Sequence, residues 1–297
     1  MDGPRYASAA AFKQALEQRL KDLGDLDRRR QLLVYDRFLA RTTIALGDAV
    51  TLKGGLGLEV RLRRARTTRD VDLRMSGSPA DLLPRLQTLG RLDLGDFMSF
   101  DVEPHPSHPV LTGAGVRYHG QRFTVRCSLV RKLYARPFGL DIGFADPMLG
   151  PPDRIAAADV LAFAGIPAPI LQVYPVVTHI AEKLHAYTLP RPTGINSRLK
   201  DLPDLALLAS AGELLAAHTH EALAQTFAFR ATHAIPHRFP DPPNEWRDRY
   251  ERMASDDRLP WRTLAAVTSA ARDFLEPVLA GLRDSRWSPA GWAWRGS

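Results

Sequence analysis

The sequence predicts a mixed α/β core followed by a helical region. Short apolar strands recur between residues 50 and 144, whereas apolar residues at helical spacing dominate after residue 175. Two stretches rich in proline and glycine, residues 147–152 and 165–169, separate these parts. Apolar residues make up 45% and charged residues 25% of the 297 residues, ordinary values for a globular chain with a sizeable core.

Residues 10–45 are expected to form two helices, because Phe12, Leu16 and Leu20 recur at helical spacing and a second apolar stripe follows. The core elements expected next are strands at 50–53, 71–75, 97–103, 116–119, 122–130 and 139–144, helices at 57–62 and 79–89, and a hairpin turn at 119–121. The helices expected further on are 175–188, 202–209, 213–229, 245–253 and 263–283. We therefore divide the chain into N-terminal helices that pack on the core (1–45), the core itself (46–165) and a helical C-terminal domain (166–297).

Composition narrows the class of protein. The formal charge of +7 and the pI of 9.8 favour a polyanionic partner, although the same charge could serve solubility alone. The single cysteine rules out an intramolecular disulfide. No signal peptide is recognised at the polar start, and no apolar run approaches the about 20 residues that cross a bilayer. We expect a cytoplasmic monomer without membrane association.

The most informative motif is Lys53-Gly54-Gly55 after the first core strand, followed by Asp70-Val71-Asp72 on the second. Alternate strand residues share a face, so Asp70 and Asp72 can share divalent metal ions. Paired glycines let the backbone approach a phosphate closely. Nucleotidyl transfer depends mainly on positioning and charge neutralisation, which two carboxylates and Mg²⁺ supply. Taken alone, however, an Asp-x-Asp pair also fits a solvated strand edge.

Asp141 lies in the apolar strand 139–144, where an unpaired carboxylate is costly to bury. It fits a third carboxylate of a metal site, and it fits equally an edge-strand aspartate or an ion pair with a nearby arginine. Arg69, next to Asp70, is a candidate partner for a phosphate.

A second set of charged residues follows in the helical region. Lys183 lies in an amphipathic helix and can reach a triphosphate as a point charge. Asp201 and Asp204 are three residues apart and so share a helix face. Asp201 can instead cap the start of its helix. Asp204 can orient Lys183 or Lys200 through an ion pair, or work directly at a nucleotide.

Five segments in order resemble the AbiEii nucleotidyltransferase toxin family, which includes the MenT-type toxins of type IV toxin–antitoxin systems. They are residues 52–58, 66–73, 140–142, 182–186 and 198–205. The resemblance implies a polymerase-β-like nucleotidyltransferase core that uses Mg²⁺ to transfer a nucleotide from an NTP to RNA, for several such toxins the 3′ end of tRNA. It also implies a cognate AbiEi-like antitoxin as a protein partner.

By motif match, Gly54 and Gly55 fall on the phosphate-binding turn, Asp70 and Asp72 on the metal pair, Lys183 on the family's lysine, and Lys200, Asp201 and Asp204 on the last motif. The combined prediction assigns catalysis to Asp70, Asp72, Lys183, Asp201 and Asp204. It assigns nucleotide binding to Lys53, Gly54, Gly55, Arg69 and Lys200. It assigns metal binding to Asp70, Asp72 and Asp141.

One residue departs from the family pattern. Many relatives carry Ser or Thr after the paired glycines, whereas this chain carries Leu56, so a hydroxyl contact to a phosphate is missing. The choice of NTP or the efficiency can differ as a result. Two other hypotheses stay open: a nucleotidyltransferase whose acceptor is a small molecule or protein, and a non-catalytic member that binds RNA or a partner.

Overall fold

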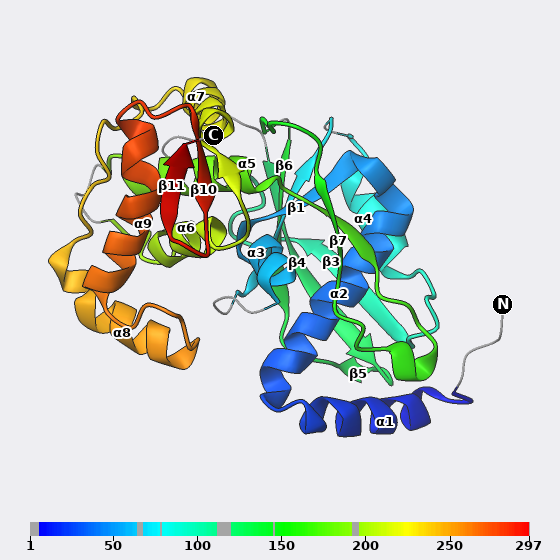
Figure 1. The fold of residues 1–297 in the computed structure, drawn as a ribbon. Coiled ribbons are helices and arrows are strands. Elements are labelled where there is room, and N and C mark those ends of the chain that lie inside the picture. Colours follow the sequence, from blue (N-terminus) through cyan, green and yellow to red (C-terminus); the bar gives the residue numbers. More distant parts are fainter. Residues whose placement is uncertain are drawn as a thin grey trace.

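The computed structural model describes residues 6–63, 68–77, 79–111, 120–144, 146–191 and 196–296. A mixed sheet with helices against it forms one part of the molecule, and a largely helical C-terminal part lies beside it (Figure 1). The helices of the described residues are α1 (Ala9–Asp22), α2 (Leu26–Leu46), α3 (Gly54–Leu62), α4 (Leu82–Gly90), α5 (Val176–Thr188), α6 (Asp201–Ala209), α7 (Ala216–Arg230), α8 (Arg247–Asp256) and α9 (Leu264–Leu279). The predicted mixed α/β class is confirmed.

The large sheet has the order β3-β4-β6-β2-β1-β8-β7, with β5 added beside β4. Its strands are β1 (Val50–Lys53), β2 (Asp70–Met75), β3 (Met98–Pro104), β4 (Gly120–Leu129), β5 (Lys132–Leu133), β6 (Phe138–Phe144), β7 (Asp153–Ala156) and β8 (Ile170–Val173). The pairs β2–β6 and β1–β8 are parallel and the other pairs are antiparallel.

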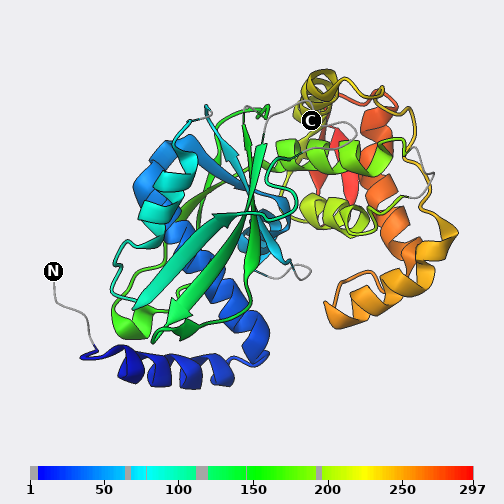
Figure 2. The same cartoon turned by 180° about the vertical axis from the view of Figure 1, so that it is seen from behind.

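Alternation of side chains gives this sheet one apolar and one polar face. In β2, Val71, Leu73 and Met75 are buried, whereas Asp70 and Asp72 are more exposed. The apolar face packs with α1, α2 and α4 in a single core. Figure 2 shows the strands in front of α2, which covers their far side. The polar residues of β2, β4 and β6 therefore gather on the opposite face.

The N-terminal helices pack as their apolar spacing predicts. Phe12, Leu16 and Leu20 of α1 are fully buried in the core that the strands share. Ser8 caps α1 by accepting a hydrogen bond from the Ala11 backbone N–H at 3.2 Å. The division of the chain into three parts remains a prediction. Strands β7 and β8 lie on either side of its boundary at residue 166, and both belong to the large sheet.

Several predicted elements differ from the structure. The turn expected at 119–121 is wrong for Gly120 and Gln121, which begin β4 because they pair with Gly143 and Ile142 of β6. Helix α3 begins at Gly54 rather than at residue 57. Leu214 and Leu215, expected in a helix, form the short strand β9 (Leu214–Leu215) because β10 pairs with them. The strand expected at 116–119 lies outside the described residues.

The C-terminal part has its own apolar core, built from α5 to α9 and a small sheet. That sheet joins β9 to β10 (Ser285–Ser288) and β11 (Ala293–Gly296). Trp287 is fully buried there and donates a hydrogen bond to the Ala209 carbonyl at 2.8 Å. Leu58 of α3 also belongs to this core, so α3 contacts both parts. Within the described ranges, no helix combines the length and apolar composition needed to cross a membrane.

Candidate active site

Three neighbouring strands carry the acidic residues of the candidate site on the polar face of the sheet. Strand β2 begins at Asp70, and the parallel strand β6 places Asp141 opposite Asp72. The antiparallel strand β4 continues this row with Arg122 opposite Asp141. Side chains at paired positions point to the same side of a sheet, so these charged groups lie together.

Two glycines make room for the carboxylates of β2. Gly54 has a φ of +66°, and a Cβ atom there would lie 1.9 Å from Oδ2 of Asp72. A Cβ atom at Gly139 would lie 2.6 Å from Oδ1 of Asp70. Gly54 therefore requires glycine for both its φ and its space, whereas a side chain at Gly139 would only displace the Asp70 carboxylate. The Asp72 carboxylate lies directly against the Gly54-Gly55 turn that begins α3.

The carboxylates repel one another. Burial, and after it the charges of Asp141 and Asp70, raise the pKa of Asp72 to about 6, although Lys53 and Lys183 lower it. Burial, followed by the charge of Asp141, also raises the pKa of Asp70. This excess of negative charge favours a bound cation.

Lys183 joins helices α5 and α6 through two carboxylates. Its Nζ lies 2.8 Å from Oδ1 of Asp201 and 2.8 Å from Oδ2 of Asp204. Both aspartates are buried, and Asp201 makes no capping hydrogen bond because Lys200 occupies the N-cap position of α6. The sequence suggested that Asp201 could cap its helix, but in the structure Asp201 forms an ion pair with Lys183 instead. Asp204 forms an ion pair with Lys183, which is one of the roles expected for it.

Lys53 lies in a buried ion network that the sequence did not reveal. Its ammonium contacts Asp146, which follows β6, and lies 3.7 Å from Oε1 of Glu182 on α5. Arg230, at the end of α7, contacts the same two carboxylates at 3.1 and 3.0 Å. The network links the sheet to the C-terminal helices next to Gly54. No local sequence signal points to Asp146 or Arg230, because they lie 84 residues apart.

The predicted third metal ligand is held by an arginine. Nε and Nη2 of Arg122 donate to the two oxygens of Asp141, each at 2.7 Å. This is the ion pair that the sequence left open as an alternative. The metal role of Asp141 stays a prediction.

Lys200 lies at the exposed rim of the site, whereas the cleft that Arg69 lines includes neither Asp70 nor Asp72. Lys200 lowers the pKa of Asp70, which indicates that its ammonium lies near that carboxylate. Arg69 lines a cleft of about 790 Å³ with Tyr35 and Thr68, bounded further by α1, α2 and the segment after β5. Both cations are placed where a charged ligand can reach them.

The fit of a metal ion can be judged from the donors present. Among the residues that the structure describes, no group of three or more His, Cys, Asp or Glu side chains is gathered closely enough to hold a metal. Asp70 and Asp72 nevertheless offer the hard oxygen donors that Mg²⁺ prefers, and this ion often binds through one or two carboxylates plus substrate phosphates. Burial, and after it mutual repulsion, raise their pKa values, and a bound cation would stabilise the ionised form of both. The pair therefore fits Mg²⁺ that arrives with a nucleotide.

Comparisons with known proteins bear on the family and the fold of the chain. The chain matches the family model "Nucleotidyl transferase AbiEii toxin, Type IV TA system" over residues 37–273. MenT4, a nucleotidyltransferase toxin from Mycobacterium tuberculosis H37Rv, is similar in structure with a TM-score of 0.55 and 15% identity, covering 97% of this chain and 93% of that chain. JHP933 from Helicobacter pylori gives a TM-score of 0.43 and 14% identity, covering 85% of this chain and 94% of that chain. A search of curated proteins finds no match.

Proposed function

The chain belongs to the AbiEii family of nucleotidyltransferase toxins, and from this premise we propose that it transfers a nucleotide from an NTP to the 3′ end of tRNA with Mg²⁺. The observation that best supports this proposal is the Asp72 carboxylate lying against Gly54, with Asp70 on the same face of β2. In the proposed reaction, the acceptor oxygen bonds to the α-phosphorus, pyrophosphate leaves, and the hydroxyl proton passes to water.

Asp70 and Asp72 hold Mg²⁺ in this proposal, with Asp141 as a third candidate ligand. When bound, the ion would neutralise phosphate charge, which is a large part of what phosphoryl-transfer sites supply. By holding the ion, the two carboxylates would fix where the phosphates bind. Because they must be ionised for this task, activity should fall as the pH drops below the pKa of about 6 of Asp72.

The triphosphate is held on the β1 side of the carboxylates. The amides of Gly54 and Gly55 begin α3, and a helix N-terminus favours phosphate. Lys53 and Lys183 contribute positive charge near Asp72, and Asp201 and Asp204 fix the Lys183 ammonium. Lys200 reaches the phosphates from the rim, and Arg69 stays a candidate phosphate partner by its position next to Asp70 in the chain.

The basic charge of the chain supports an RNA acceptor, because lysine and arginine track phosphate backbones and release counterions. RNA affinity should therefore fall steeply with salt. The type IV toxin–antitoxin family implies an antitoxin partner, which we propose to be AbiEi-like. We propose that the toxin acts as a monomer in the cytoplasm.

The alternatives to this proposal differ from it in the molecule that receives the nucleotide, or in whether any transfer takes place. The same carboxylates could transfer a nucleotide to a small molecule or a protein, and a non-catalytic member would bind RNA without transfer. Leu56 stands where many relatives carry Ser or Thr, so the backbone amides bind the phosphate without a side-chain hydroxyl. This difference affects the choice of NTP more than the choice of acceptor.

The test incubates the protein and Mg²⁺ with each α-labelled NTP in turn, together with total tRNA, a protein lysate or a small-molecule extract. We expect label on tRNA, and none on tRNA whose 3′ hydroxyls have been destroyed by periodate. Asp72→Asn should abolish labelling, whereas Asp101→Asn, at an exposed aspartate of β3, should not. Label on protein or small molecules alone would favour the other acceptors. Unchanged labelling by Asp72→Asn would overturn the catalytic assignment.

A further inference from the structure

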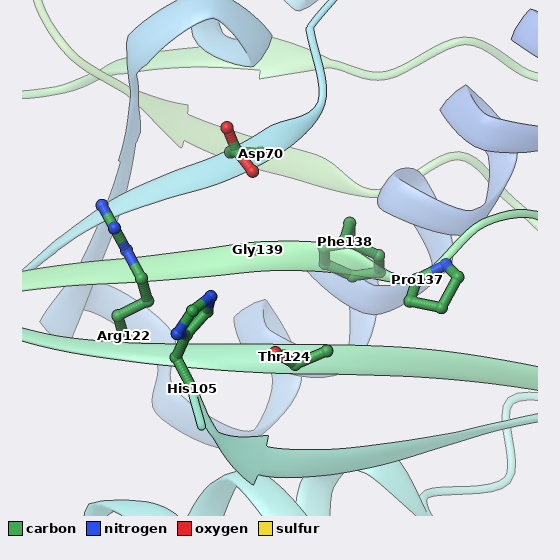
Figure 3. Close-up of a pocket in the computed structure, with 7 residues that line it drawn as sticks. All are labelled: Asp70, His105, Arg122, Thr124, Pro137, Phe138 and Gly139. Atoms are coloured by element: carbon green, nitrogen blue, oxygen red, sulfur yellow. The ribbon is translucent and has the colours of Figure 1, made fainter. Parts of the chain in front are cut away.

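A pocket of about 290 Å³ opens beside Asp70 on the polar face of the sheet (Figure 3). Asp70 lies on one side, and Arg122 and Thr124 of β4 and His105 at the end of β3 lie on the other, with Gly139 between them. Its volume is close to the lower end of the range for small-ligand pockets, about 300 to 1,000 Å³. The pocket can therefore take a group the size of a sugar and its phosphate.

The pocket is on the opposite side of Asp70 from the elements assigned to the NTP. The sheet order β4-β6-β2-β1 places Gly54, which follows β1, on one side of β2. It places Arg122 and Thr124 of β4 on the other side, beyond β6. A ligand in the pocket can thus lie next to the candidate metal pair without displacing a nucleotide at Gly54.

His105 presents a hydrogen-bond donor to this pocket. Its Nδ1 accepts hydrogen bonds from the backbone N–H groups of Ser107 at 3.3 Å and His108 at 3.2 Å. A neutral imidazole that accepts at one nitrogen carries its hydrogen on the other, so Nε2 is the donor. The His108 ring stacks on His105 with centroids 5.9 Å apart and helps to hold it in place.

Arg122 is held in a fixed orientation by Asp141. The two hydrogen bonds to Asp141 use only part of the donor fork of the guanidinium. The side chain remains 37% exposed, so its other N–H groups can reach an anion in the pocket. An arginine held in this way is suited to a phosphate, because less rotamer freedom is lost on binding.

We propose that this pocket binds the last phosphate and ribose of the RNA acceptor. Arg122, His105 and Thr124 bind the phosphate, and the 3′ hydroxyl then lies at Asp70. Asp141 is in this case a positioning residue that acts through Arg122. The inference rests on the proposed function and adds the residues that would recognise the acceptor.

The test measures binding of a short 5′-labelled RNA by fluorescence anisotropy, and compares it with the same RNA carrying an uncharged methylphosphonate as its last linkage. We expect the natural RNA to bind about tenfold more tightly, as for a charge-assisted contact. His105→Ala and Arg122→Ala should remove most of this preference, and His105→Gln, which keeps a donor, should retain more of it. His218→Ala, at an exposed histidine of α7 outside the pocket, is the matched control. Equal binding of the two RNAs by the unaltered protein would overturn the proposal.

Binding of NTP and Mg²⁺, measured by calorimetry, separates this inference from the proposed function. We expect His105→Ala to bind NTP as the unaltered protein does, while its KM for RNA rises. Absence of NTP binding in the unaltered protein would instead contradict the proposed function. Asp141→Asn should raise the KM for RNA more than it lowers kcat. A loss confined to kcat would overturn the positioning role and favour Asp141 as a metal ligand.

Discussion

Among single residues of the site, Asp72 combines burial with two acidic neighbours. Its pKa of about 6 lies above the value of about 3.9 expected in the unfolded chain. The folded state therefore binds the extra proton between these values, and stability falls as the pH rises through that interval. We expect Asp72→Asn to stabilise the protein at pH 8, by on the order of 1–2 kcal/mol, and to have little effect at pH 4. Thermal unfolding at both pH values, with Asp101→Asn as the control, tests this. Equal effects at the two pH values would contradict it.

Gly54 allows a second test at the same scale. An alanine there meets both a φ of +66° and the Asp72 carboxylate, whereas Gly77 has a φ of +80° and nothing within 4 Å of its Cβ position. Gly77→Ala should therefore cost only the left-handed strain, about 1–2 kcal/mol. Gly54→Ala should cost more, and should weaken NTP binding, because the carboxylate must move. Urea unfolding and calorimetric NTP titration give both quantities. A similar loss of stability for the two variants, with intact NTP binding, would show that the close approach is unimportant.

At the scale of helices and strands, the alternation of apolar residues and the spacing of glycines predict much of the site. Which strands pair with one another cannot be predicted from these local patterns. The apolar alternation of β2 and β6 places Asp72 and Asp141 on strands, and Gly54 marks the turn. The register that sets Arg122 beside Asp141 depends on which strands become neighbours, which no local pattern encodes. The same holds for Gly120, where a glycine typical of a turn begins a long strand instead, because β6 supplies its hydrogen-bonding partners.

The pair of helices α5 and α6 depends on Lys183 for its charge balance. Replacing it by methionine keeps an apolar stem of similar length but leaves Asp201 and Asp204 buried without their cation. We expect Lys183→Met to cost about 3–5 kcal/mol at pH 7. The loss should shrink when Asp204→Asn is added. Arg126→Met, which breaks an exposed pair with Glu103, should cost less than about 1 kcal/mol. Urea unfolding checks the series, and equal losses for Lys183→Met and Arg126→Met would refute the argument.

The whole molecule consists of two apolar cores, and the sequence indicated both without showing how they are joined. The core of the sheet and the core of the C-terminal helices meet around α3, which contributes residues to each. Beside it, Lys53, Asp146, Glu182 and Arg230 form one buried network. Lys53 and Asp146 lie 93 residues apart, so only the folded chain reveals their pairing. Since this network adjoins Gly54, the docking of the two parts should also fix the phosphate-binding turn.

Natural probes allow this coupling to be measured. All five tryptophans lie in the C-terminal part, and the single cysteine, Cys127, is buried in the core of the sheet. In the unaltered protein, tryptophan fluorescence and Cys127 labelling should report unfolding at the same urea concentration. Arg230→Met removes one cation from the network and leaves two buried carboxylates to Lys53, so the fluorescence transition should move to lower urea before Cys127 becomes reactive. Arg272→Met, which breaks an exposed pair with Asp241, should leave the two signals coincident. Coincident and unshifted transitions in Arg230→Met would mean that the two cores are held together by their apolar contacts alone.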